Sequence, residues 1–142
     1  MNLYIDTSVF VKLLIEEEDS DAAREIWGGA GRLATSRLTY PETRAALARA
    51  ERAGRLNADA RRHAVGMFEA EWGSLDVVVD IRDPVARLAG GAAEAFGLRT
   101  GDAIHLATAI SMAGPELVVA TWDRALALAA SRAGLGVAPP LE

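Results

Sequence analysis

Apolar residues follow two alternating patterns along this chain. Four short runs rich in Val, Ile, Leu, Tyr or Thr predict β-strands at residues 3–6, 32–36, 75–79 and 117–121. Between these runs, apolar residues recur every three or four positions, which is the spacing of amphipathic helices. The predicted helices cover residues 9–15, 20–27, 42–53, 57–71, 83–96, 102–113 and 123–133, and Val137 begins a small edge strand.

Local signals fix where some of these helices begin and end. Pro41 is accepted only in the first turn of a helix, so Glu42 must lie close to the N-terminus of its helix, which Gly54 ends. Asp83-Pro84 combines a cap residue with a first-turn proline. Residues 97–101 are predicted to form the loop that precedes Asp102.

Strands that alternate with helices predict an α/β fold with a mostly parallel sheet covered on both faces. A length of 142 residues, of which 51% are hydrophobic, suits a single domain over residues 1–142 with a sizeable core. In open parallel sheets, ligands bind at the carboxyl ends of the strands. We therefore expect any site at that edge.

Four carboxylates stand where this edge is predicted. Asp6 ends the first strand, Asp123 follows the fourth, and Glu42 and Asp102 open helices that can start at the same edge. Clustered acids repel one another, which makes a divalent cation the natural occupant. Oxygen ligands from separate elements suit Mg²⁺, which can activate a water and offset charge on the leaving oxygen of a phosphodiester. We expect all four to hold one magnesium site.

The remaining composition narrows the classes of function. Cysteine is absent, which excludes a disulfide framework and a thiolate metal site, and two histidines are too few for a typical zinc centre. We expect no secretory signal and no membrane span, and a reducing cytoplasm fits. A net charge of −5 argues against coating nucleic acid by bulk electrostatics, although it leaves a nuclease open.

Each acid also has an ordinary structural explanation. Asp102 and Asp123 can cap their helices, and Glu42 can interact with the dipole of its helix. Asp6 is the strongest candidate ligand, because Thr7 or Ser8 could have capped its helix instead. Thr121 carries a hydroxyl that could orient Asp123.

Other polar residues are weaker candidates. Asp80 also ends a strand, but no hydroxyl-rich turn follows it, and the acids among residues 16–21 read as a solvated charge run. His105 lies one turn beyond Asp102 on an apolar helix, and we interpret it as a structural histidine rather than a general base. Trp122, beside Asp123, could line a nucleotide path. A cluster of arginines could meet phosphate or an acidic partner: Arg44, Arg49, Arg52, Arg55, Arg61 and Arg62.

Four segments resemble the PIN-domain ribonucleases, and in particular the small toxins of the VapBC toxin–antitoxin type. They are residues 4–8 (YIDTS), 40–42 (YPE), 98–107 (LRTGDAIHLA) and 121–123 (TWD). Each segment is short, and their order and spacing together carry the resemblance, which covers essentially the whole length.

The resemblance implies an α/β/α sandwich around a sheet of strand order 3-2-1-4-5. It also implies Mg²⁺ or Mn²⁺ held by Asp6, Glu42, Asp102 and Asp123, with Ser8 and Thr121 supporting these acids. The activity implied is endoribonuclease cleavage that leaves a 5′-phosphate and a 3′-hydroxyl and inhibits translation. Partners implied are RNA, a second copy of the chain and an antitoxin, with residues 42–71 as the binding groove and with RNA or antitoxin contacts at Arg44, Arg49, Arg52, Arg55 and Arg99.

Two other functions remain open. A PIN-like scaffold could bind RNA or protein through its arginines without cleaving, and it would then bind without magnesium. A phosphatase with Asp6 as nucleophile is weaker, because that chemistry commonly places a second aspartate two residues on, where this chain has Ser8.

Overall fold

Five parallel strands form one sheet in a computed structural model that describes residues 1–142. Their order is β3-β2-β1-β4-β5, with every neighbouring pair parallel. This confirms the expected strand order and places the first strand at the centre. The strands are β1 (Asn2–Ile5), β2 (Arg32–Ser36), β3 (Val77–Val79), β4 (Leu117–Ala120) and β5 (Gly136–Ala138).

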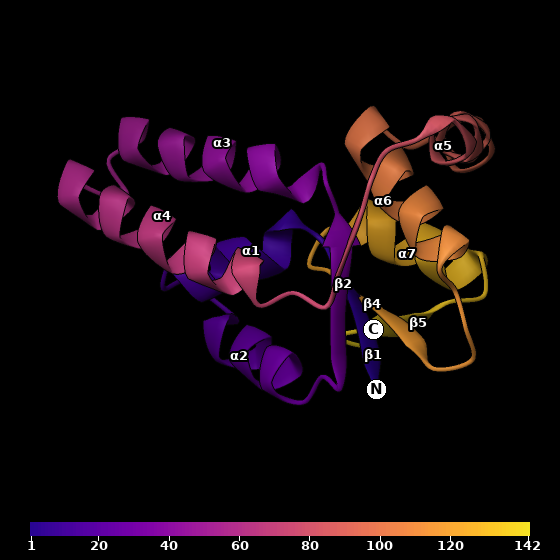
Figure 1. The fold of residues 1–142 in the computed structure, drawn as a ribbon, viewed down its shortest axis with the longest axis horizontal. Coiled ribbons are helices and arrows are strands. Elements are labelled where there is room, and N and C mark those ends of the chain that lie inside the picture. Colours follow the sequence, from indigo (N-terminus) through magenta and orange to yellow (C-terminus); the bar gives the residue numbers. More distant parts are fainter.

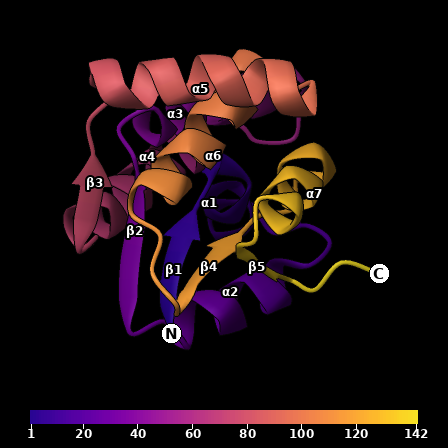
Figure 2. The same cartoon turned by 90° about the vertical axis from the view of Figure 1, so that its right-hand side faces the viewer.

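Helices cover both faces of the sheet and complete the expected three layers. Figure 1 shows the sheet nearly edge-on, with α1 to α4 on one side and α5 to α7 on the other. Figure 2 views the molecule from the side of α5 to α7, and β1 and β4 point towards the region of α6 and α1. The helices are α1 (Thr7–Leu14), α2 (Ser20–Gly28), α3 (Thr39–Arg52), α4 (Ala58–Gly73), α5 (Asp83–Phe96), α6 (Thr100–Ser111) and α7 (Arg124–Arg132).

The central strand β1 divides the core in two. Successive side chains of a strand point to opposite faces. Tyr4 therefore packs with residues of α6 and α7, whereas Leu3 and Ile5 pack with Phe10 and Phe68 on the other face. Leu3, Tyr4 and Ile5 are fully buried, which fixes the position of the carboxyl end of β1.

Several element boundaries differ from the sequence expectation, and α3, for example, begins at Thr39, three residues before Glu42. Helix α6 begins at Thr100, so Asp102 is the third residue of the helix and the expected 97–101 loop is shorter. The reason is local: Gly97 ends α5 in the left-handed conformation (φ 64°), and the next residue, Leu98, already packs against the core. The third strand is limited to Val77–Val79. No helix has the length and apolar character needed to cross a membrane.

We expect opposite effects from alanine at two glycines of α5. Gly97→Ala should lower the free energy of unfolding by about 1 kcal/mol, because a side chain is strained at a positive φ. Gly91→Ala should raise it by up to about 1 kcal/mol, because this helical position is open and alanine favours helix. Denaturant unfolding checks both values, and equal stability of the two variants would contradict this reading of the α5 terminus.

Candidate active site

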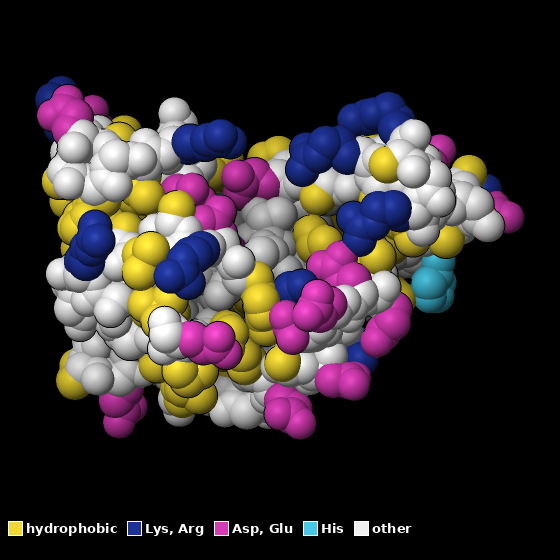
Figure 3. Space-filling model, turned by 180° about the vertical axis from the view of Figure 1, so that it is seen from behind, with side chains coloured by type: hydrophobic (Ala, Val, Ile, Leu, Met, Phe, Trp, Pro, Cys, Tyr) yellow, Lys and Arg dark blue, Asp and Glu magenta, His cyan; other side chains and the backbone are white.

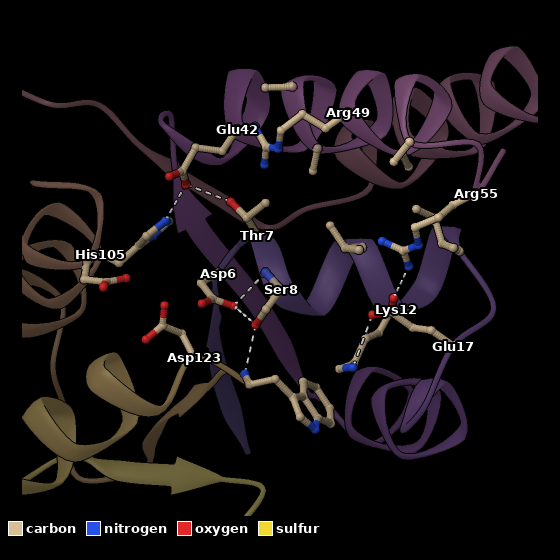
Figure 4. Close-up of a pocket in the computed structure, with 18 residues that line it drawn as sticks. Asp6, Thr7, Ser8, Lys12, Glu17, Glu42, Arg49, Arg55, His105 and Asp123 are labelled. Atoms are coloured by element: carbon tan, nitrogen blue, oxygen red, sulfur yellow. Dashed lines mark hydrogen bonds and ion pairs between the residues drawn. The ribbon is translucent and has the colours of Figure 1, made fainter. Parts of the chain in front are cut away.

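A pocket of about 660 Å³ opens at the carboxyl edge of the sheet and brings the four predicted acids together. Asp6 follows β1 and Asp123 follows β4, where each is the N-cap residue of the next helix. Glu42 and Asp102 lie in the first turns of α3 and α6. Figure 4 shows Asp6, Asp123 and Glu42 facing into this pocket. Four separate elements thus deliver one carboxylate each.

Asp6 is the most buried of the four and the most firmly held. Its side chain is 4% exposed. Ser8 donates to Oδ1 through its amide (3.0 Å) and its hydroxyl (2.5 Å), and the Thr121 hydroxyl donates to Oδ2 (2.6 Å). Burial nevertheless raises the pKa of Asp6, against the lowering effects of His105 and the two hydroxyls. Asp6 therefore caps α1 itself and is oriented by both Ser8 and Thr121.

Asp123 lies close enough to Asp102 to affect the ionisation of Asp102. Asp123 Oδ1 accepts a hydrogen bond from the amide of Leu126 (3.0 Å), so this acid does cap its helix. Thr121 accepts a bond from the Asp123 amide rather than orienting the Asp123 carboxylate. Burial, followed by the negative charge of Asp123, raises the pKa of Asp102 to about 6. The position of Asp102 within α6 excludes the capping explanation for it.

One oxygen of Glu42 is committed to protein partners, and the other is not. Oε1 accepts from the Thr7 hydroxyl (2.7 Å) and from Nε2 of His105 (2.7 Å). Oε2 makes no protein hydrogen bond and faces Gly101, where an added Cβ would lie 3.0 Å away. The glycine at this point of α6 therefore leaves room for the second carboxylate oxygen.

His105 connects this carboxylate to the core. Because an ionised carboxylate only accepts hydrogen bonds, Nε2 of His105 carries a proton, and Nδ1 is hydrogen-bonded to the hydroxyl of buried Tyr4 (2.7 Å). Burial alone would lower the pKa of His105, but Glu42 and the charge of Asp6 raise it. Burial alone would raise the pKa of Glu42, but His105 and Thr7 lower it. The two shifts agree with an ion pair.

Sequence reasoning underestimated His105. We interpreted it as a structural histidine, and it does satisfy a buried tyrosine, but it also holds a pocket acid in place. The signal was present in the sequence: residues three apart on a helix lie on the same face, and His105 is three residues after Asp102. His105 is therefore a positioning residue for Glu42.

The predicted arginines are spread over several surfaces. Arg49 and Arg55 line the pocket, whereas Arg52 and Arg99 do not. Arg44 pairs with Glu69 instead (3.4 Å). Arg61 and Arg62 also form ion pairs, with Glu51 and Asp59 respectively.

Two acids that we did not predict as site residues differ in position, since one lies in the pocket and the other outside it. Glu17 belongs to the run that we expected to be solvated, yet it lines the pocket and binds Lys12 (3.2 Å). Asp80 follows the edge strand β3 and pairs with Arg37 (2.9 Å), outside the pocket. Asp80 is therefore a matched control for the pocket acids.

The side chains suit a hard cation in chemical type. The four acids offer only carboxylate oxygens as metal ligands. Both ring nitrogens of the neighbouring His105 are already hydrogen-bonded. No group of three or more acids or histidines is already arranged to hold an ion. This open arrangement fits Mg²⁺, which keeps several waters and commonly uses only one or two carboxylates together with substrate phosphates.

Removing the His105 side chain should destabilise the protein. His105→Ala leaves the buried Tyr4 hydroxyl without its partner and Glu42 with the Thr7 hydroxyl alone, so we expect the free energy of unfolding to fall by about 2–4 kcal/mol. His63→Ala is the matched control, because His63 is exposed on α4, and it should change stability by less than about 0.5 kcal/mol. Denaturant unfolding compares the variants, and equal stabilities would contradict the described network.

Known proteins resemble this chain in both sequence and fold. The model of the PIN domain family matches residues 3–131. Ribonuclease VapC49 of Mycobacterium tuberculosis is 43% identical over 140 residues, covering 96% of this chain and 94% of the relative. The crystal structure of M. tuberculosis VapC20, a toxin that cleaves the sarcin-ricin loop, superposes with a TM-score of 0.64 at 20% identity, covering 94% and 96% of the two chains. A toxin–antitoxin complex from Klebsiella pneumoniae superposes with a TM-score of 0.60 at 21% identity, covering 85% of each chain. With four acids in one pocket on this fold, the chain belongs to the PIN-domain family, among homologues of the VapC ribonucleases.

Proposed function

We propose that this chain is a metal-dependent endoribonuclease and the toxin of a type II toxin–antitoxin pair. The observation that carries the proposal is the meeting of Asp6, Glu42, Asp102 and Asp123 in one pocket, each brought by a different element. A relative at 43% identity that is named a ribonuclease supports the same reaction. A binding module that does not cleave would have no need of four acids that repel one another.

The proposed cofactor is Mg²⁺, with Mn²⁺ as a substitute, bound by these four acids. When bound, the ion would lower the pKa of a water and offset the charge that develops on the leaving oxygen. Ser8 and Thr121 hold Asp6 in a fixed orientation before the substrate arrives. Thr7 and His105 do the same for Glu42 and leave its Oε2 free.

The proposed partners follow from the relatives and from the position of the pocket. VapC20 is a toxin that cleaves the sarcin-ricin loop, and the Klebsiella pneumoniae structure with the same fold is a toxin–antitoxin complex. We propose that this chain likewise cleaves RNA to inhibit translation, in the cytoplasm, and that a cognate antitoxin silences it. We also propose a homodimer, with the surface of α3 and α4 serving antitoxin or dimer contacts.

Replacing one pocket acid should abolish cleavage and leave the fold intact. Asp6→Asn keeps the size of the side chain and should lower magnesium-dependent RNA cleavage by more than about 100-fold, since removing the partners that merely orient metal ligands already costs about 10–100-fold. Asp80→Asn, on the outer strand, should cleave as the wild type does. Both are measured on purified protein with and without chelator. Full cleavage by folded Asp6→Asn, with contaminating nuclease excluded, would refute the proposal.

The gap at Gly101 offers a second test that leaves every acid in place. Gly101→Ala would put a methyl group 3.0 Å from Glu42 Oε2, and Glu42 cannot move freely because Thr7 and His105 hold its other oxygen. We expect RNA cleavage to fall about 10–100-fold. The control is Gly91→Ala, which enters open space on α5. Equal activity of the two variants would show that Glu42 tolerates displacement.

A further inference from the structure

The pocket has an acidic end and a basic end. The acids that follow β1 and β4 occupy one end, and Lys12, Arg49 and Arg55 line the rest of it. Figure 4 shows this division, with Arg49 on α3 between Glu42 and the group formed by Lys12, Glu17 and Arg55. In Figure 3, acidic side chains border the hollow between the two halves of the molecule, and Lys and Arg side chains lie around it. Of the arginines that the sequence predicts to contact RNA or an antitoxin, only Arg49 and Arg55 line this basic end.

Two of the three cations share a single acid, Glu17. Arg55 donates to Glu17 Oε2 (2.6 Å), and Lys12 donates to Glu17 Oε1 (3.2 Å) and to the carbonyl of Glu18 (2.8 Å). Lys12 also lies over the Trp122 ring, 5.4 Å from its centroid. The charge of Glu17 therefore weakens the attraction of both cations for an anionic ligand.

Arg49 is the uncommitted cation of the pocket. It is exposed, and neither a hydrogen bond nor an ion pair joins its guanidinium to any protein group, in contrast to the pairs formed by Arg44 and Arg55. Arg49 lies two helical turns after Glu42 on α3. Side chains on a helix lean towards its N-terminus, and Figure 4 shows Arg49 reaching back towards Glu42. Its positive charge is near enough to help lower the pKa of Glu42.

We propose that the Arg49 guanidinium binds a backbone phosphate of single-stranded RNA next to the phosphodiester held at the acidic end. The proposal rests on the proposed ribonuclease function and names the part of the site that holds its substrate. A guanidinium presents a rigid fork of donors that matches phosphate. Such a contact positions the strand without reading its sequence.

The pocket favours this ligand over the alternatives. Its volume is in the range of small-molecule sites, which suits a few nucleotides of an unpaired strand. A carboxylate-rich protein segment could pair with Arg49, but the four acids would not attract it. A phosphodiester strand uses both the acidic end and the basic end of the pocket. Arg49 also offsets the repulsion that a polyanion meets when it approaches a chain of net charge −5.

Arg52 provides a matched control for the experiment. It is on the same helix, exposed and free of ion pairs, but the structure places it outside the pocket despite our sequence expectation. Binding of a short, unstructured, fluorescently labelled RNA is measured in an Asp6→Asn background with Mg²⁺, over a series of salt concentrations. Arg49→Ala should weaken binding about 10-fold and make the slope of log K against log [salt] shallower by about 0.7, the value for one phosphate contact on a single strand. Arg52→Ala should leave affinity and slope unchanged.

The outcomes separate this inference from the proposed function. Equal slopes for Arg49→Ala and Arg52→Ala would overturn the role of Arg49 even if the wild type cleaves RNA. Equal slopes together with weaker antitoxin binding by Arg49→Ala would assign the arginine to the protein partner instead. If the slopes differ as expected but the wild type never cleaves RNA, the phosphate contact stands and the nuclease function fails.

Discussion

The mutual repulsion of carboxylates at one sheet edge is the constraint on which this site depends. Parallel strands end on the same side, so the acids that follow β1 and β4 meet there whether or not their charges are compensated. Burial is the main cause of the raised pKa values of Asp6 and Asp102, and the negative charge of Asp123 adds to both. A divalent cation bound in this pocket would offset the repulsion.

Hydrogen bonds determine which oxygens are available to that cation. Ser8 and Thr121 fix Asp6, while Thr7 and His105 bind one oxygen of Glu42 and leave the other free. His105 also satisfies Tyr4, which belongs to the core between β1 and α6. Core packing and site geometry are therefore coupled, because the same imidazole serves both.

The sequence was sufficient for the elements and the acids, but not for every contact between side chains. Apolar periodicity located the strands and helices, and the family resemblance supplied the strand order that periodicity alone could not. The start of α6 was placed two residues late, because packing of Leu98 shortened the preceding loop. Arg49 and Arg52 look equivalent in sequence; only the direction in which each leaves α3 separates a pocket residue from a surface one. The role of His105 could not be predicted either, because it depends on contacts with residues that lie 63 and 101 positions away in the sequence.

The most direct measurement is the location of manganese by anomalous scattering in crystals of the wild-type protein grown or soaked with Mn²⁺. A cation held by the acid cluster predicts an anomalous peak in the pocket among Asp6, Asp102, Asp123 and the free oxygen of Glu42, and no such peak in the Asp6→Asn protein. No peak in the pocket at saturating Mn²⁺, or a peak that persists unchanged in Asp6→Asn, would contradict a metal site built from these four acids.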